Sequence, residues 1–329
     1  MRSTPWNSLT AFSLFVAAGI STMTVSNTIL DPTRAPQLTD ARLQLHHAAQ
    51  LATALGISYL PKQADDGHTN LEWRSELGAL VSHVAPDAGD ARIGVRAADL
   101  SLLVLDAEFA RVADLPLTGE TLESAASWLR SRLAERGADA SRFTLTKHYT
   151  IPTHALDSGA AFDTRDSVAF AQLAAWFDTA NDALSRARSR HANTSDIRCW
   201  PHHFDLAFLI EPQAGASVGV GLEPGDAYYD EPYFYVNMNP APKASELTDA
   251  LAGRGTWHTR EWVGAVLPGS RLAAGHSEPV VRHPERSEGS SVRSSESAKV
   301  QQSDQVDAFL NSAIAAAIAH VTHPAAAIK

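Results

Sequence analysis

A histidine and an aspartate near the middle of the chain have the types and spacing that a polar site needs. His203 and Asp205 follow the Trp200-Pro201 pair and precede an apolar run. If the segment is extended from His202 onward, the two side chains share one face, about 6.5–7 Å apart at Cα. The carboxylate can then orient the imidazole as a general base, or both groups can bind one metal ion or polar ligand. The alternative is that they satisfy each other, or the backbone, at the solvated end of a half-buried strand.

Two tyrosines on a later predicted strand can complete this site. In the segment 233–238, Tyr233 and Tyr235 alternate with apolar residues, which places both rings on one face. Phenol groups on such a face can line a pocket, although tyrosines also occur at sheet edges with their hydroxyl groups in water. We therefore expect a small polar ligand to be bound by His203, Asp205, Tyr233 and Tyr235.

Histidines elsewhere in the sequence offer further ligands for a metal ion. His154 lies in an irregular segment, and His258 lies near the start of another predicted strand. Three histidine or carboxylate ligands from separate strands suit zinc, iron or manganese, but a chain with 14 histidines offers other combinations as well. The alternative function is a metal-dependent hydrolase, in which His203 and Asp205, together with His154 and His258, hold the ion that activates a water nucleophile.

Several well-known reaction motifs are absent from the sequence. The chain contains no G-x-x-x-x-G-K-[ST] phosphate loop and no H-E-x-x-H zinc helix. Gly219 and Gly221 lack the third glycine of a dinucleotide fingerprint and lead to Pro224 rather than to a helix. Cys199 lies close to the histidines in sequence, but side chains three and four residues apart on an extended chain do not converge, so we do not expect a cysteine nucleophile.

The composition of the chain indicates an ordinary globular protein and argues against two classes of partner. The 329 residues are 44% hydrophobic and 19% charged, enough for one large domain or two modest ones. A net charge of −10 argues against a nucleic-acid partner. No segment reaches the about 18–20 apolar residues that span a bilayer. The single cysteine cannot form an internal disulfide, which favours a reducing, cytoplasmic location.

The N-terminal arm, residues 1–38, supports a different interpretation of the location. Leu9–Ile20 is an apolar run with the length of a signal-peptide hydrophobic region, although only Arg2 precedes it as a basic residue. Export is therefore the alternative to a cytoplasmic location. Translation that starts at Met23 is a further explanation, and residues 1–22 are then an annotation artefact or a disordered arm.

The predicted elements indicate an α+β fold with antiparallel sheets flanked by helices. Helices are expected at 40–56, 118–136, 166–188 and from about 303, and strands at 71–74, 79–84, 91–96, 100–105, 143–149, 202–211, 218–221, 233–238 and 257–267. In the first helix, His47 falls on the apolar stripe, whereas Arg42, His46, Gln50 and Thr53 form a face expected to contact water. The order helix, strands, helix occurs twice, so we expect a structural duplication with halves near 39–147 and 163–322. The corresponding domain ranges are 39–150 and 151–329.

Residues 276–303 are expected to form a disordered insertion within the second half. The segment is polar, charged and rich in serine, and such a composition cannot bury enough apolar surface to offset the entropy of ordering. Its part from Arg282 to Ser291 is similar to translated repeat DNA. The last helix is then expected to begin at Ser303, as its N-cap.

Two sequence patterns resemble an uncharacterised bacterial family of unknown function. The patterns are Trp200-Pro-His-His-Phe-Asp-Leu-Ala and Gly225-Asp-x-Tyr-Tyr-Asp-Glu-Pro-Tyr-Phe-Tyr-Val, and the similarity extends through Ile151-Pro-Thr-His154 and Trp257-His258. The resemblance implies a bacterial origin and a single ancestral unit over 39–322, and it implies no activity. Besides ligand binding and metal-dependent hydrolysis, a purely structural or interaction role therefore stays open.

Overall fold

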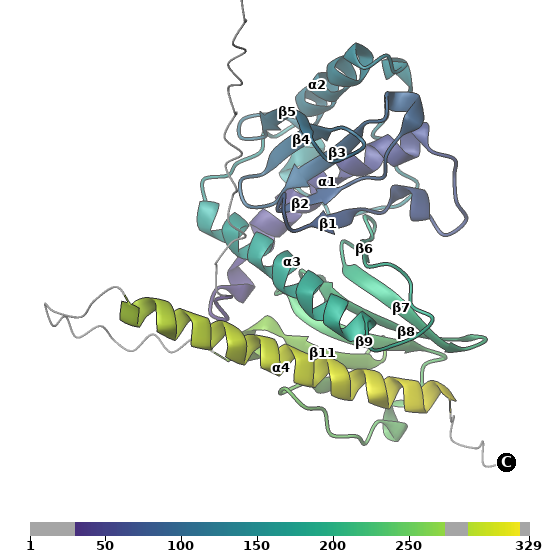
Figure 1. Ribbon diagram of the computed structural model, residues 1–329, viewed down its shortest axis with the longest axis vertical. Coiled ribbons are helices and arrows are strands. Elements are labelled where there is room, and N and C mark those ends of the chain that lie inside the picture. The colour runs from purple at the N-terminus through teal and green to yellow at the C-terminus, as the bar shows by residue number, and fades with distance from the viewer. Residues whose placement is uncertain (1–29, 274–288, 323–329) are drawn as a thin grey trace, which may run out of the picture.

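The computed structural model describes residues 30–273 and 289–322, with the side chains of 30–273 and 296–322 (Figure 1). Within these residues the chain forms four α-helices and two antiparallel sheets, which confirms the predicted α+β class. The helices are α1 (Thr39–Tyr59), α2 (Leu122–Glu135), α3 (Ser167–Arg188) and α4 (Gly289–Thr322). None of the described helices is both long enough and apolar enough to cross a membrane.

The first sheet has five strands in sequence order, each pairing with the next. Its strands are β1 (Glu72–Arg74), β2 (Ala79–Val81), β3 (Arg92–Arg96), β4 (Ser101–Leu105) and β5 (Arg111–Pro116). Side chains along each strand alternate between the two faces of this sheet. On one face, the paired residues Ile93 and Val104 lie in the main hydrophobic core. The opposite face carries a smaller cluster around Leu103 and Phe109. Helices α1 and α2 pack together on the main-core side.

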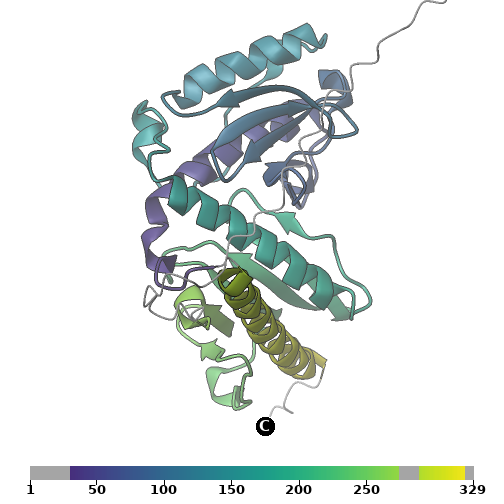
Figure 2. The same ribbon diagram turned by 60° about the vertical axis from the view of Figure 1, so that its left-hand side comes forward.

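The second sheet has six strands in the order β10-β11-β9-β8-β7-β6. Its strands are β6 (Arg198–Cys199), β7 (Leu206–Gln213), β8 (Ala216–Glu223), β9 (Tyr233–Asn239), β10 (Thr256–His258) and β11 (Gly264–Pro268). The apolar faces of the central strands are fully buried, as at Phe208, Val220 and Val236. Helices α3 and α4 pack side by side against these strands and cross the sheet (Figures 1 and 2).

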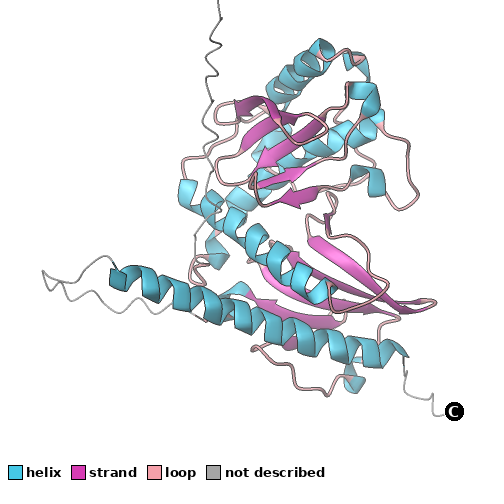
Figure 3. Ribbon diagram, in the orientation of Figure 1, coloured by secondary structure: helices cyan, strands magenta, loops and turns pink. Residues whose placement is uncertain are grey.

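The order helix, antiparallel strands, helix occurs in both halves of the chain, as Figure 3 shows by colour. Each sheet with its helices is called a unit below. Helix α1 contacts both units, because it begins beside the second sheet and ends against the first (Figure 2). The sheets also touch directly: Leu71 and Cys199 exchange two backbone hydrogen bonds of 2.9 and 2.8 Å. The two halves therefore share one continuous core.

The structure corrects some of the expected elements. The segment 143–149 is not a strand, because the Thr144 N–H donates to the Ser58 hydroxyl group and the buried Phe143 packs beside α2 instead of pairing with a sheet. Strand β5 was not among the expected strands. Helix α4 begins at Gly289 rather than Ser303, and its Gln302 is buried with its amide donating to the Leu30 and Ala273 carbonyl oxygens. Residues 276–288 of the expected insertion, and Leu9–Ile20, lie outside the described residues.

Candidate functional site

The segment that carries His203 and Asp205 is a turn, and the strand expected from His202 does not begin until Leu206. Residues 201–203 turn between β6 and β7, and Phe204 has a positive φ of 76°. This backbone conformation directs the Phe204 ring into the core, where it stacks on His46 at 4.4 Å between ring centres. As a result His203 is exposed and Asp205 is buried, with 8% of its surface accessible.

Helix α1 holds this turn in place through side chains expected to face water. The Pro201 carbonyl oxygen accepts hydrogen bonds from His46 Nε2 at 2.8 Å and from Gln50 Nε2 at 3.0 Å. Both side chains are buried, and so are Arg42 and Thr53 of the same face, because the second unit covers that side of the helix. Burial lowers the pKa of His46 to about 4, even though its hydrogen bond to Pro201 favours the charged ring.

Asp205 is bound by one of the two tyrosines proposed from the sequence. The Tyr235 hydroxyl group donates to Asp205 Oδ2 at 2.5 Å. To reach β7 from β9, the Tyr235 ring lies flat across β8 over Gly221, where a Cβ atom would be 2.7 Å from the ring and 2.8 Å from the Ala207 Cβ. Gly219 makes room for Asn237 in the same way. The glycine pair on β8 therefore serves packing of the sheet surface.

A second buried carboxyl group, Glu223, lies beside Asp205. The strand register pairs Leu206 with Leu222 and Glu223 with Tyr233, so Asp205, one residue before Leu206, is the neighbour of Glu223. Burial raises the pKa of both carboxyl groups, and the charge of Asp205 raises that of Glu223 further. Asp205 Oδ1 and Glu223 Oε1 are buried without a hydrogen-bond partner among the described residues.

Three polar residues, Tyr233, Asp226 and Arg42, interact electrostatically with Glu223. Tyr233 is buried, and its hydroxyl group donates to Asp226 Oδ2 at 2.9 Å. The Arg42 guanidinium of α1 lies against Gly225, where a Cβ atom would be only 2.0 Å from Nη1, and it forms an ion pair with Asp230 at 3.3 Å. Arg42 also favours ionised Glu223.

The structure brings together three of the residues proposed from the sequence and leaves a fourth, His203, exposed to solvent. Asp205, Tyr235 and Tyr233 belong to one cluster with Glu223, and the charge of the exposed His203 acts on Asp205. Sequence reasoning missed Glu223 because the expected strand ended at residue 221, whereas β8 continues to Glu223. The sequence could have indicated this position, because Glu223 is two residues after Gly221 and four after Gly219. On an extended strand, residues at this spacing lie on the same face.

The other histidines of the expected metal set lie in different environments. His154 Nε2 lies 3.2 Å from Asp40 Oδ1. His258 accepts from the Tyr229 hydroxyl group at 2.9 Å, donates to the Arg260 carbonyl oxygen at 2.6 Å and stacks on Trp262. In the part of the chain that the structure describes, no three histidine, cysteine or acidic side chains are placed to hold a metal ion.

Two nucleophile candidates, Cys199 beside the carboxyl groups and Ser217 at the other end of β8, are part of the sheet framework. Cys199 is fully buried, and burial raises the pKa of its thiol, so it lacks the thiolate character of a reactive cysteine. Gly215, Ser217 and Gly219 have the G-x-S-x-G spacing of a nucleophile elbow. Ser217 nevertheless lies inside β8, paired with β9, and not on the strand-to-helix turn that the elbow requires.

Comparisons with family models, with curated proteins and with solved structures found no match to this chain. This outcome is consistent with the resemblance to an uncharacterised family and adds no activity to it. The chemistry of the site must therefore be argued from its own geometry.

Proposed function

We propose that this protein binds a small polar molecule that carries a protonated amine, with Asp205 and Glu223 as the receptor for the ammonium group. The observation that supports the proposal is the pair of buried oxygens, Asp205 Oδ1 and Glu223 Oε1, that have no partner among the described residues. An ionised carboxyl group only accepts hydrogen bonds, whereas an ammonium group supplies three donors and a positive charge. Such a ligand therefore supplies the hydrogen-bond donors and the positive charge that the two buried carboxyl groups lack.

The neighbouring tyrosines suit the same class of ligand. Tyr233 and Tyr235 place their ring centres 6.4 Å apart beside the carboxyl groups, and aromatic faces attract cations. The Tyr235 hydroxyl group is the donor that an incoming ammonium group would replace on Asp205. The exposed His203 is two residues from Asp205 and would be the nearest solvent-accessible side chain of the set. We place the protein in the cytoplasm, in agreement with its single cysteine, which is unpaired.

The two carboxyl groups also allow a purely structural interpretation. One proton shared between Asp205 and Glu223 also satisfies the two oxygens, because the protonated group becomes a donor. An ammonium ligand must release that proton when it binds. Amine affinity should therefore increase as the pH rises through the raised pKa of the pair, until the amine itself loses its proton.

Isothermal titration with methylamine, ethanolamine and putrescine, in buffers of different ionisation enthalpy, tests the proposal. We expect binding with proton release, and an affinity about tenfold lower or worse in Asp205→Asn and Glu223→Gln. Glu211→Gln is the matched control, because Glu211 is an exposed acid on β7. The proposal is wrong if none of the three amines binds the wild-type protein, or if Glu211→Gln loses as much affinity as the two site variants.

A further inference from the structure

Arg42 of helix α1, beside the two carboxyl groups, is a buried cation with few hydrogen-bond acceptors. Its side chain is 9% accessible, and a guanidinium carries five N–H donors. Among the described residues, this guanidinium donates one hydrogen bond, from Nη2 to Asp230 Oδ1 at 3.3 Å. The Asp230 side chain is 66% accessible and also accepts from the Thr39 hydroxyl group at 2.6 Å. Most of the donor groups of Arg42 therefore have no acceptor among the described residues.

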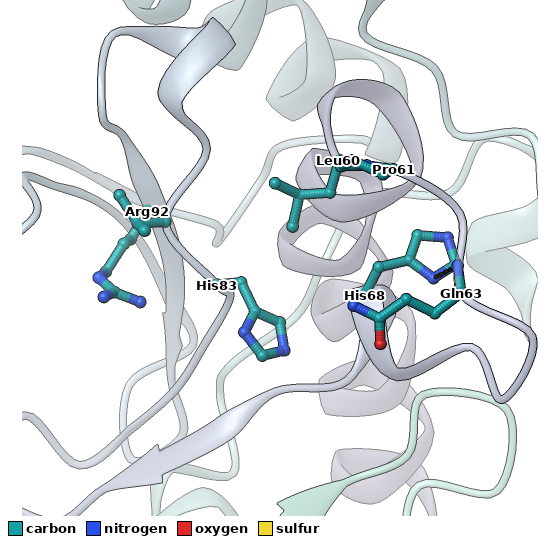
Figure 4. Close-up of a pocket in the computed structure, with 7 residues that line it drawn as sticks. Leu60, Pro61, Gln63, His68, His83 and Arg92 are labelled. Carbon is teal, nitrogen blue, oxygen red and sulfur yellow. Dashed lines mark hydrogen bonds between the residues drawn. The ribbon is translucent and has the colours of Figure 1, made fainter.

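Arg92 of the first sheet shows how the fold satisfies another guanidinium. Its Nε and Nη1 groups donate to the Ala107 and Ser82 carbonyl oxygens at 3.3 and 3.2 Å, and it lies 4.3 Å from the Phe109 ring centre. In Figure 4 it lies at the side of a pocket of about 320 Å³ and points away from His68 on the opposite wall. In the part of the chain that the structure describes, the arginine of α1 has no such carbonyl oxygen and no such ring.

The other carboxyl groups of the turn that faces Arg42 are bound to different donors. Asp226 accepts two backbone N–H groups through Oδ1 and the Tyr233 hydroxyl group through Oδ2. Glu231 accepts the N–H and the hydroxyl group of Ser270 at 2.6 and 2.9 Å. An acceptor for the remaining N–H groups of Arg42 must therefore come from solvent or from a ligand.

Arg42 and the proposed ammonium receptor contact the same residue, Gly225. The Gly225 N–H favours the ionised Glu223 carboxyl group through a hydrogen bond. A Cβ atom on Gly225 would be 2.0 Å from Arg42 Nη1, so the guanidinium lies directly against this glycine. The ion pair of Arg42 is nevertheless with Asp230 and not with Glu223. A single residue therefore separates the buried cation from the buried carboxyl group, a distance that a short molecule with two charged ends can span.

We propose that the ligand is a short amino acid, whose carboxylate binds Arg42 while its ammonium group binds Asp205 and Glu223. This inference rests on the proposed function, because it adds a receptor for the second end of the same molecule. A guanidinium presents paired N–H groups that match the two oxygens of a carboxylate. Asp230 competes for the same N–H groups, and its exposure shows that solvent reaches this side of Arg42.

Calorimetric titration of the full chain with pairs of compounds that differ only in the carboxylate tests the proposal. Glycine is compared with methylamine, β-alanine with ethylamine, and 4-aminobutyrate with propylamine, at equal ionic strength. We expect at least one amino acid to bind about tenfold or more tightly than its amine, because a charge-assisted hydrogen bond to Arg42 is added. The pair with the largest ratio of affinities gives the distance between the two receptors.

Three variants assign the ratio to Arg42. Arg42→Met should remove the gain within the pair, and the ratio is the quantity to compare, because Arg42 also acts on Glu223. Arg34→Met is the matched control, because Arg34 is partly exposed and pairs with Asp31 at 3.8 Å, so the ratio should not change. Asp230→Asn removes the competing carboxylate and should increase the ratio.

The wild-type pairs and Asp230→Asn decide the question if Arg42→Met folds poorly. The inference is overturned if the amines bind and no amino acid binds more tightly than its amine. In that case the proposed function stands, and Arg42 only balances the charge of the acidic groups. Equal loss of the ratio in Arg34→Met and Arg42→Met, or an unchanged ratio in Asp230→Asn, also overturns it. If none of the compounds binds, the proposed function fails as well.

Discussion

The two buried carboxyl groups of the second sheet, Asp205 and Glu223, and the half-buried Arg92 of the first sheet are two solutions to holding ionisable groups inside one protein. In the cluster, Asp205 and Glu223 meet across adjacent strands, where the sheet register determines their distance. On the first sheet, the Arg92 guanidinium donates to the Ala107 and Ser82 carbonyl oxygens and stacks on the Phe109 ring. The difference teaches that charge of either sign can be kept in this core, provided that backbone carbonyl oxygens or phenol groups replace part of the water.

The largest effect should be a loss of stability at acidic pH, caused by protonation of His46 on α1, the helix that supports the carboxyl cluster. His46 titrates near 6.5 when unfolded and at about 4 in the folded protein, so its contribution to stability is complete above pH 6.5 and is lost as the pH falls through 4. The loss should reach about 3 kcal/mol, and His46→Gln should abolish it. Urea denaturation between these pH values measures it. His203→Gln, at an exposed site on the same turn, is the control, and equal acid sensitivity of wild type and His46→Gln would contradict the assignment.

A smaller loss of stability should distinguish Gly221 of the second sheet from Gly94 of the first sheet. Gly221→Ala places a methyl group 2.7 Å from the Tyr235 ring, which must leave Asp205, so we expect a loss of about 1–3 kcal/mol. Gly94 on β3 is the matched control, because its nearest neighbour would be 3.4 Å away and Gly94→Ala should cost less than about 0.5 kcal/mol. Thermal or chemical denaturation of both variants compares them. Equal losses would mean that Gly221 has no special role under Tyr235.

The smallest expected effect is a gain in stability. The raised pKa of Glu223 means that its stabilising, protonated form is complete below the unfolded pKa of about 4.3 and is lost as the pH rises through the folded value. Glu223→Gln carries a permanent amide donor toward Asp205, and at pH 8 it should be more stable than wild type by about 1 kcal/mol. Denaturation at pH 5 and 8 measures the gain, with Glu211→Gln as control. A variant that is less stable at both pH values would show that the ionised carboxyl group is the stabilising form.

Local patterns in the sequence were sufficient for most of the elements. The helix expected at 166–188 is α3 (Ser167–Arg188), with Asp166 as its N-cap, and Tyr233 and Tyr235 alternate with core residues on β9. The polar face of α1 could not be placed, because His46 and Gln50 are buried by a turn more than 150 residues later in the chain. The helical pattern shows that such residues share a face, but it does not show what covers that face.

The candidate site was predicted in part for the same reason. Asp205 and Tyr235 were named from their types, but their hydrogen bond depends on the order of β7, β8 and β9 and on Gly221. Glu223 becomes a partner of Asp205 only when the strand register is known. The positive φ of Phe204 depends on the space beside His46, so no pattern of alternation could have indicated it.

The two backbone hydrogen bonds between Leu71 and Cys199 have a consequence for fragments of the chain. They join the edge of one sheet to the edge of the other, so the backbone of neither edge is free to pair with another chain at that point. A truncated protein that ends between the halves would expose this edge together with the buried side of α1. Such a piece should self-associate rather than stay monomeric, which makes the pair of halves the smallest unit that is safe from aggregation.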